Sequence, residues 1–412
     1  MAEPHPLLPR VAAAAVERAL RVFPVAVIMG ARQTGKTTLA RQISEGSDRS
    51  YVTLDDVDVR DRAKNDPRGL VTQAPGLVID EVQRVPDLLL EIKRAVDEEP
   101  RRRTGRFILT GSADLLLMRS VTESLAGRAG YVDLWPMTRG ELDGGGRCGL
   151  WSELFGVPVQ EWPGVLEQAA LERTDWRERV LTGGYPVPAY ELDAASDRYE
   201  WYQGYVRTYL ERDLRELAAI DQLEDFRRLM AVASLRLGNV LNQADLARDA
   251  HLSPATAHRY LNLLETSFQL VRIPPYAGNL TKRLTKSPKV FWCDAALALH
   301  LGRSSEPTGA HLENLVLTDL LAWRESRRRR PEILYWRTYE GVEVDFVLEA
   351  EGQLLAVEVK SARRPRFRDT AGLRAFRDLH GDRVHGSLLL HAGDDVTWLS
   401  EGVLAAPWWR VM

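Results

Sequence analysis

The chain has 412 residues, of which 45% are apolar and 27% are charged, and its formal net charge is −3. This composition is typical of a globular protein, and the length allows roughly two to four domains. A slightly acidic chain does not bind nucleic acid through its overall charge, so any such binding must come from local patches.

No segment contains the roughly 18–20 consecutive apolar residues that a membrane helix needs, and the N-terminus lacks a basic stretch followed by an apolar one. The two cysteines, Cys148 and Cys293, have no metal-binding spacing and predict no disulfide framework, which fits a reducing compartment. We therefore expect a cytoplasmic protein with no membrane partner.

Short apolar runs alternate with amphipathic segments over the first 130 residues or so, which predicts α/β units around a parallel sheet. Farther along, the pattern is mainly helical, with long helices expected at 197–220 and 225–237. The C-terminal part returns to a helix, expected at 309–324, and then to strands. The expected strands are 25–29, 51–54, 77–80, 106–110 and 130–134 in the first part, and 333–339, 342–349 and 354–359 in the last.

Residues 30–37 read Gly-Ala-Arg-Gln-Thr-Gly-Lys-Thr, which fits the phosphate-loop pattern GxxxxGK followed by Ser or Thr. The motif follows an apolar strand and opens a helix, so its backbone N–H groups and the helix dipole face the phosphates. We expect Lys36 to bridge the β- and γ-phosphates of ATP and the Thr37 hydroxyl to ligate Mg²⁺. The expected nucleotide-binding residues are Gly30, Ala31, Arg32, Gln33, Thr34, Gly35, Lys36, Thr37 and Thr38.

Two further apolar strands end in polar side chains that suit the same site. The strand 77–80 ends in Asp80, expected to hold the Mg²⁺ shell, and Glu81 follows, suited to polarising the attacking water. The strand 106–110 ends in hydroxyls, and either Thr110 or Ser112 is expected to sense the γ-phosphate, because strand ends converge on the ligand in such sheets. Arg128 precedes the fifth strand and is expected to reach a neighbouring subunit's γ-phosphate; the alternative is a surface arginine that caps a helix.

At this point the sequence resembles the prokaryotic AAA+ ATPases that combine an AAA_14 core with a DUF4143 region. The core resemblance also includes Pro9-Arg10, which implies that Arg10 belongs to the nucleotide site. The C-terminal resemblance rests on Gly-Gly-Tyr-Pro at 183–186, Tyr-Leu-Glu-Arg-Asp-Leu at 209–214 and Glu-Val-Asp-Phe at 343–346. It spans nearly the whole chain and implies an AAA+ module, a winged-helix element and a restriction-endonuclease-like C-terminal fold.

Residues 241–276 also predict a helix-turn-helix from their own pattern. Ser253 followed by Pro254 is a strong helix start, and the polar face of the second helix suits a major groove. Basic residues between two later apolar strands are expected to form a wing near DNA phosphates. The alternative is a lid or packing surface without DNA contact. The expected DNA-binding residues are Thr256, Arg259, Asn262, Lys282, Arg283 and Lys286, with Lys289 on the same wing.

Near the C-terminus, Asp345 and the sequence Glu358-Val359-Lys360 have the form D-x₁₂-ExK, which resembles the PD-(D/E)xK nuclease signature. In such a site Asp345 and Glu358 hold Mg²⁺, Lys360 positions the water, and Glu313 is a candidate further carboxylate. The alternative is that these carboxylates only satisfy nearby basic groups. The arginine runs at 101–103 and 327–330 are interpreted as solvated surface, whereas the run at 363–368 has an additional case for guiding a phosphate backbone.

The expected fold class is α/β: a P-loop AAA+ parallel-sheet domain at 1–140, a helical lid or linker at 141–222, a winged-helix domain at 223–304, and a restriction-endonuclease-like domain at 305–412. The leading hypothesis is a Mg²⁺-dependent ATPase that engages or remodels DNA, including branched or junction DNA, as a homo-oligomer with six subunits by analogy with the family. Two alternatives stay open: an ATP-regulated, Mg²⁺-dependent endonuclease, and an NTP-driven switch for protein assembly or signalling.

Overall fold

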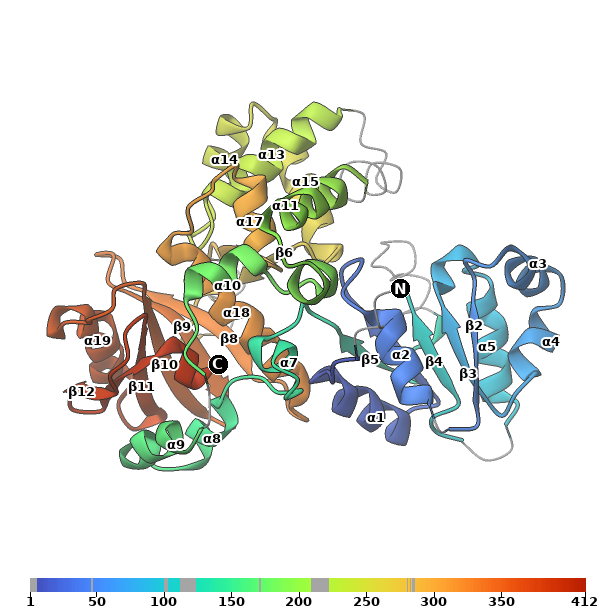
Figure 1. Cartoon of the computed structure of the whole chain (residues 1–412), viewed down its shortest axis with the longest axis horizontal. Helices are drawn as coiled ribbons and strands as arrows, with labels where there is room; N and C mark the ends of the chain where they lie inside the picture. The colour runs from blue at the N-terminus through green and yellow to red at the C-terminus, as the bar shows by residue number, and fades with distance from the viewer. Residues whose placement is uncertain are drawn as a thin grey trace.

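The computed structural model describes residues 6–45, 47–99, 103–111, 124–169, 172–208, 222–279, 281, 283 and 286–412. Figure 1 shows an N-terminal sheet on the right, a C-terminal sheet on the left, and a mainly helical module above them. No helix in this part of the chain has the length and apolar character needed to cross a membrane.

The N-terminal sheet has five parallel strands in the order β2-β3-β4-β1-β5. Every residue of its central strands β1 and β3 is buried, as expected for parallel strands covered on both faces. All five predicted strands of this part are confirmed to within two residues. They are β1 (Val25–Met29), β2 (Arg49–Thr53), β3 (Gly76–Asp80), β4 (Phe107–Thr110) and β5 (Ala129–Asp133).

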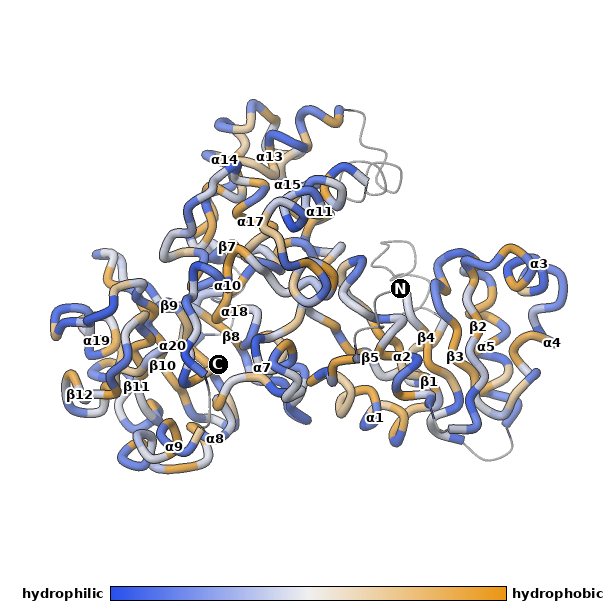
Figure 2. Tube along the Cα trace, in the orientation of Figure 1, coloured by the Kyte–Doolittle hydropathy of each residue, from blue (hydrophilic) through white to orange (hydrophobic). Residues whose placement is uncertain are grey.

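Helices cover both faces of this sheet. Alternate residues of β1 point to opposite sides, so Ala26 and Ile28 join the core under α1 and α2, whereas Val25 and Val27 join the core under α3 to α5. In Figure 2 the strands run as largely orange, hydrophobic segments, and α3 on the outside is mostly blue. These helices are α1 (Ala12–Val22), α2 (Lys36–Ser44), α3 (Val57–Asn65), α4 (Pro67–Thr72) and α5 (Leu88–Asp97).

The segment after β5 crosses to the far side of the molecule and returns. The Leu150 amide donates to the carbonyl of Val411 at 2.8 Å, and the ring of Trp162 lies 6.0 Å from that of His385. The helix expected at 197–220 begins as predicted, but its residues 209–220 lie outside the described chain. The helices are α7 (Arg139–Leu142), α8 (Trp151–Gly156), α9 (Trp162–Gln168), α10 (Trp176–Thr182) and α11 (Ala195–Tyr205).

The helical module contains the predicted pair of helices joined by a tight turn. Asn242 caps α14 by accepting from two backbone N–H groups, and Ser253 caps α15 with Pro254 at its first position. A two-stranded antiparallel pair, β6 and β7, follows. The module comprises α13 (Leu223–Leu235), α14 (Gln243–Asp249), α15 (Pro254–Thr266), β6 (Leu270–Ile273), β7 (Lys289–Trp292) and α17 (Ala295–Leu301).

The C-terminal sheet is mixed, with strand order β12-β13-β11-β10-β9-β8. Strands β8 to β10 form an antiparallel meander, and β10, β11 and β13 run parallel to each other. The predicted helix and the three predicted strands are confirmed within two residues. The elements are α18 (Gly309–Ser326), β8 (Glu332–Arg337), β9 (Glu343–Ala350), β10 (Gln353–Lys360), α19 (Ala371–His380), β11 (Val384–His391), β12 (Thr397–Ser400), β13 (Val403–Pro407) and α20 (Trp408–Val411).

A buried carboxyl group on α18 fixes the crossing segment. Asp319 Oδ1 accepts from the amide of Gly149 at 2.8 Å and from the indole of Trp151 at 2.6 Å. Its Oδ2 is buried and has no hydrogen-bond partner within the described residues. Burial raises the pKa of Asp319 from 3.8 to about 7. The folded protein therefore holds this proton more tightly than the unfolded chain does.

We predict that Asp319→Asn changes the pH dependence of the free energy of unfolding. A raised folded pKa makes the wild type lose stability as pH rises from about 4 to about 7. The neutral amide keeps the Oδ1 acceptor and has no such loss, so the variant gains stability relative to the wild type over this range. Urea unfolding at several pH values measures the difference, and a difference that does not vary with pH contradicts the prediction.

Candidate functional site

The phosphate loop has a backbone that only its glycines adopt without strain. Gly30 has a φ of 150°, and a Cβ there would lie 2.2 Å from the carbonyl oxygen of Leu134. Gly35 has a φ of 92° and directly precedes α2. The turn thus needs glycine at both glycine positions of the motif, once for the close approach of Leu134 and once for the left-handed conformation.

The Lys36 side chain is buried inside this loop. Its ammonium group donates to the carbonyl of Gly30 at 3.1 Å and to that of Ala31 at 2.7 Å. Burial lowers the pKa of Lys36 to about 8, and the charges of Glu81 and Asp80 act in the opposite direction. The ammonium is therefore charged at neutral pH but close to its titration range.

Asp80, at the end of β3, is the centre of the hydrogen-bond network. The Thr37 hydroxyl donates to its two carboxylate oxygens at 2.9 and 3.1 Å, and the Tyr51 hydroxyl donates to Oδ2 at 2.9 Å. The hydroxyl of Thr110 also donates to Oδ1. A buried carboxylate and the hydroxyl beside it offer oxygen ligands to a metal ion, and Mg²⁺ prefers oxygen ligands.

Glu81 follows in the left-handed conformation, with a φ of 58°. Its amide donates to the Thr110 hydroxyl at 3.3 Å, and the Gln83 amide donates to its carboxylate. Burial raises the pKa of Glu81. A carboxylate with a raised pKa in a positive-φ position is the kind of strained acid or base found at reaction sites.

Arg10 lies beneath the loop and supports it. Its guanidinium donates to the carbonyls of Thr34 at 2.8 Å and Trp135 at 2.7 Å, and pairs with Glu141 at 3.1 Å. These contacts join α1, the phosphate loop and the segment after β5. The sequence gives no local signal for the ion pair between Arg10 and Glu141, because the two residues are 131 positions apart. Glu141 also belongs to the N-terminal capping box of its own helix, α7.

Other predicted residues lie apart from this network. Arg128 is at the surface, where it forms a two-point ion pair with Asp97 at 2.6 and 2.9 Å. Ser112 lies outside the described residues.

Tyr51 was not predicted as a site residue. It lies on β2, the strand adjacent to β3, so the register of the parallel sheet is the signal that could have identified it.

The phosphate loop also contacts the helical module. Ala31 belongs to the same hydrophobic cluster as residues of α13 to α15, and the Tyr205 hydroxyl donates to the carbonyl of Arg32 at 3.4 Å. The Gly-Gly-Tyr-Pro segment joins the residues after β5 to the helical module. The carbonyl of Gly184 accepts from the Met137 amide at 2.7 Å, and the Gly184 amide donates to Asp294 at 2.6 Å.

The predicted DNA-binding residues separate into two groups. On α15, Arg259 is exposed, whereas Thr256 and Asn262 are half-buried and bonded to Ser253 and Arg272 respectively. The wing prediction needs correction. Arg283 is buried and pairs with Glu332 and Glu349, because the segment after β6 docks onto β8 through Pro275 and Tyr335. Lys286 is exposed, and Lys282 lies outside the described residues.

The nuclease-like residues do come together, but around an internal cation. The Lys289 ammonium, from β7, lies 3.1 Å from Asp345 and 3.8 Å from Glu313, and also pairs with Glu343. The Lys289 side chain is only 1% exposed. Burial alone would lower the pKa of Lys289, but the carboxylates of Asp345, Glu313 and Glu343 outweigh it, so the pKa is raised. Lys289 was expected on the wing, and this position corrects that expectation.

The remaining two members of the signature lie beside this cluster. Glu358 pairs with Lys360, and its second oxygen is buried without a partner in the described chain. Burial and then Asp345 raise the pKa of Glu358 to about 8. A Mg²⁺ ion needs charged oxygens around it at about 2.1 Å, whereas the Lys289 ammonium lies among Asp345, Glu313 and Glu343 here. The residues therefore do not fit Mg²⁺ in this arrangement, and no group of three or more acidic, His or Cys side chains within the described chain is arranged for a metal.

Comparisons with known proteins identify the family of this chain. Residues 22–142 match AAA_14, described as an AAA domain, and residues 173–308 and 308–411 match two domains of unknown function, DUF8612 and DUF4143. Proteins called uncharacterized in Mycobacterium tuberculosis and Mycobacterium bovis are each 30% identical over 410 residues, covering 97% of this chain and 83% of theirs. The chain belongs to this family of AAA ATPases with an AAA_14 core and a DUF4143 region.

Two solved structures align with this chain at low sequence identity. A Walker-type ATPase of Pyrococcus abyssi matches with 15% identity and a TM-score of 0.44, over 72% of this chain and 99% of that one. A RuvB variant of Thermotoga maritima matches with 19% identity and a TM-score of 0.29, over 64% and 87%. The family match, together with the phosphate loop, defines this chain as a nucleotide-binding P-loop ATPase.

We predict that ATP affinity falls as pH rises through about 8, because the Lys36 ammonium loses its charge there. Calorimetric titration with ATP from neutral pH upward measures this. In the control, Lys36→Arg, the side chain keeps its charge over the whole range, so its affinity is weaker overall but varies little. A wild-type affinity that stays constant well above pH 8 contradicts the prediction.

A second prediction concerns the internal cation. Lys289→Ala removes the cation that Asp345, Glu313 and Glu343 share, which costs about 3–5 kcal/mol of stability because Asp345 is buried. A divalent ion then has a vacated place among oxygen ligands, so Mn²⁺ raises the melting temperature of the variant but not that of the wild type. Lys360→Ala is the matched control, because Lys360 is partly exposed and, among the described residues, forms an ion pair only with Glu358. Equal Mn²⁺ effects on wild type and Lys289→Ala would refute this account of the cluster.

Proposed function

We propose that this ATPase uses MgATP hydrolysis to engage or remodel DNA, including branched DNA, as a ring-forming homo-oligomer. Thr37 and Asp80 hold Mg²⁺, which neutralises phosphate charge when bound. Lys36 contacts the β- and γ-phosphates, and the amides of residues 30–38 surround them. Arg10 keeps this loop in place.

Hydrolysis is assigned to Glu81, which orients and polarises the attacking water, with Thr110 positioned to respond to the γ-phosphate. Support comes from the Thr110 hydroxyl, which joins the amide of Glu81 to the carboxylate of Asp80. Arg128 is assigned to the neighbouring subunit's site. Its ion pair with Asp97 lies at the surface, where it is exchangeable at small energetic cost.

The main support for a role on DNA is the connection between the phosphate loop and the module that contains the helix-turn-helix. Ala31 belongs to the hydrophobic cluster that includes α13 to α15, and the Tyr205 hydroxyl donates to the Arg32 carbonyl. We infer that a change of the loop on hydrolysis is passed to this module. The exposed face of α15, with Arg259 and His258, is the surface assigned to the major groove. The hairpin that follows is assigned to docking on the C-terminal sheet instead of to DNA.

The endonuclease alternative has less support, because Lys289 fills the position between the carboxylates that a metal would need. Glu313, Asp345, Glu358 and Lys360 are therefore assigned to joining the helical module to the C-terminal sheet. The restriction-endonuclease-like fold of that sheet is part of this proposal.

The test is the ATPase rate with no DNA and with single-stranded, duplex and four-way DNA. We predict that DNA raises the rate of the wild type and that Glu81→Gln lowers it by about 10²-fold or more in every condition. Arg259→Ala lowers the DNA-dependent increase. A rate that is indifferent to every DNA, with intact basal hydrolysis, contradicts the DNA proposal and favours the protein-assembly alternative.

A further inference from the structure

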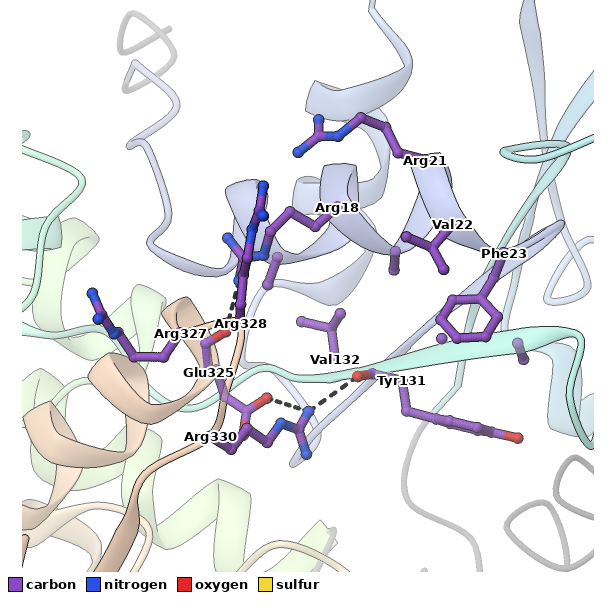
Figure 3. Close-up of a pocket in the computed structure, with 14 residues that line it drawn as sticks. Arg18, Arg21, Val22, Phe23, Tyr131, Val132, Glu325, Arg327, Arg328 and Arg330 are labelled. Carbon is purple, nitrogen blue, oxygen red and sulfur yellow. Dashed lines mark hydrogen bonds and ion pairs between the residues drawn. The ribbon is translucent and has the colours of Figure 1, made fainter. Parts of the chain in front are cut away.

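A groove of about 630 Å³ lies where the N-terminal sheet meets the end of α18. Its walls come from α1, from the strand β5 at the edge of the sheet, and from the residues after α18. Figure 3 shows side chains from these three elements facing the same space, although α1 and the end of α18 are about 300 positions apart in sequence. The groove is separate from the nucleotide site.

The groove collects positive charge. Five of its lining residues are arginines, and the one acidic lining residue, Glu325, has a side chain that is only 1% exposed. Glu325 pairs with Arg330 and accepts from Arg18 through its backbone carbonyl at 3.2 Å, so its charge is already matched. The five are Arg18, Arg21, Arg327, Arg328 and Arg330.

Most of these charges repel one another. The pKa of Arg18 is lowered by burial and then by the charges of Arg328, Arg21 and Arg327. Within the described chain, neither Arg21 nor Arg328 has a carboxylate partner. Arg330 pairs with Glu325 and lies 3.9 Å from Asp133, so the groups available to a ligand include those of Arg21 and Arg328. Guanidinium groups gathered in this way favour a multiply charged anion, and their planar donors suit phosphate.

The groove also has an apolar side. Ala15, Ala19 and Val132 are buried along it, and Phe23 is half-buried. In Figure 3 the Phe23 ring lies on the side opposite Arg327 and Arg328. The Tyr131 ring packs against the core under α3 to α5, on the other face of the sheet. Guanidinium groups on one side and an aromatic ring on the other occur together where single nucleic-acid strands bind.

We propose that this groove binds the phosphate backbone of a nucleic-acid strand. The arginines of α1 and of the segment 327–330 contact successive phosphates, and the apolar side with Phe23 receives sugars or bases. This inference deepens the proposed function and rests on it where the strand is DNA. It adds a nucleic-acid contact on the ATPase core itself, away from the surface of α15.

The test uses the full chain and fluorescence anisotropy with labelled single-stranded DNA, duplex DNA and RNA of one sequence, at several salt concentrations. The groove variant is Arg21→Glu with Arg328→Glu, both exposed. The matched control is Arg62→Glu with Arg177→Glu, two exposed arginines outside the groove with the same charge change. Circular dichroism and melting confirm that each variant folds, and Arg21→Gln with Arg328→Gln repeats the test without reversed charge.

We expect the groove variant to lose more than about tenfold in affinity and to show a smaller salt dependence, since fewer phosphates are contacted. The control keeps its affinity. If RNA alone binds through the groove, this inference stands while the DNA function fails. If affinity survives in the groove variant but is lost in Arg259→Ala, the inference fails and the DNA function stands. Wild type that binds none of the three probes, or a groove variant that changes only the oligomeric state, overturns the inference.

Discussion

The carboxylate of Asp80 is the interaction on which the rest of the site depends. It is 4% exposed and receives hydroxyls from three directions: Thr37 at the start of α2, Tyr51 on β2 and Thr110 on β4. Only a parallel sheet with β3 between β2 and β4 brings these three groups to one point. Because a buried carboxylate is costly without such partners, the strand order and the catalytic centre support each other.

The nucleotide site is also joined to the remainder of the chain. Arg10 connects the loop to Trp135 and Glu141, and Gly184 connects the following segment to Asp294 at the start of α17. The chain then crosses to the C-terminal sheet before the helical module forms, so sequence order and spatial order differ. A motion of the phosphate loop has short, buried routes to both the helical module and the C-terminal sheet.

The sequence correctly predicted the features that depend only on residues close together in the chain. The phosphate loop, the caps of α14 and α15 and the alternation on β9 are local patterns, and their backbone follows from local steric and hydrogen-bonding rules. The environments of Lys289 and Arg283 were not predictable in this way. Each looked like an exposed basic residue of a wing, but carboxylates more than twenty positions away surround both. A local run of basic residues does not show whether a given side chain will face solvent or pair with a carboxylate that is distant in sequence.

The same limit applies inside the ATPase core. Tyr51 became a site residue only because its strand pairs in parallel with β3, and the arginine groove exists only because α18 ends beside α1. The arginine run at 327–330 was interpreted as solvated surface. Its side chains are indeed exposed, but the sequence did not show that they lie beside the arginines of α1. Composition and periodicity identify elements and their chemistry, whereas the pairing of distant elements decides which charges meet.

The central claim is that Asp80 and Thr37 together supply the metal-dependent step of ATP hydrolysis. The most direct measurement is the steady-state phosphate release of Asp80→Asn as Mg²⁺ is titrated, with Tyr51→Phe as a neighbouring control. The account predicts that Asp80→Asn still binds ATP but releases almost no phosphate at any Mg²⁺ concentration, whereas Tyr51→Phe stays active. Hydrolysis by Asp80→Asn at the wild-type rate and with the wild-type Mg²⁺ dependence would contradict it.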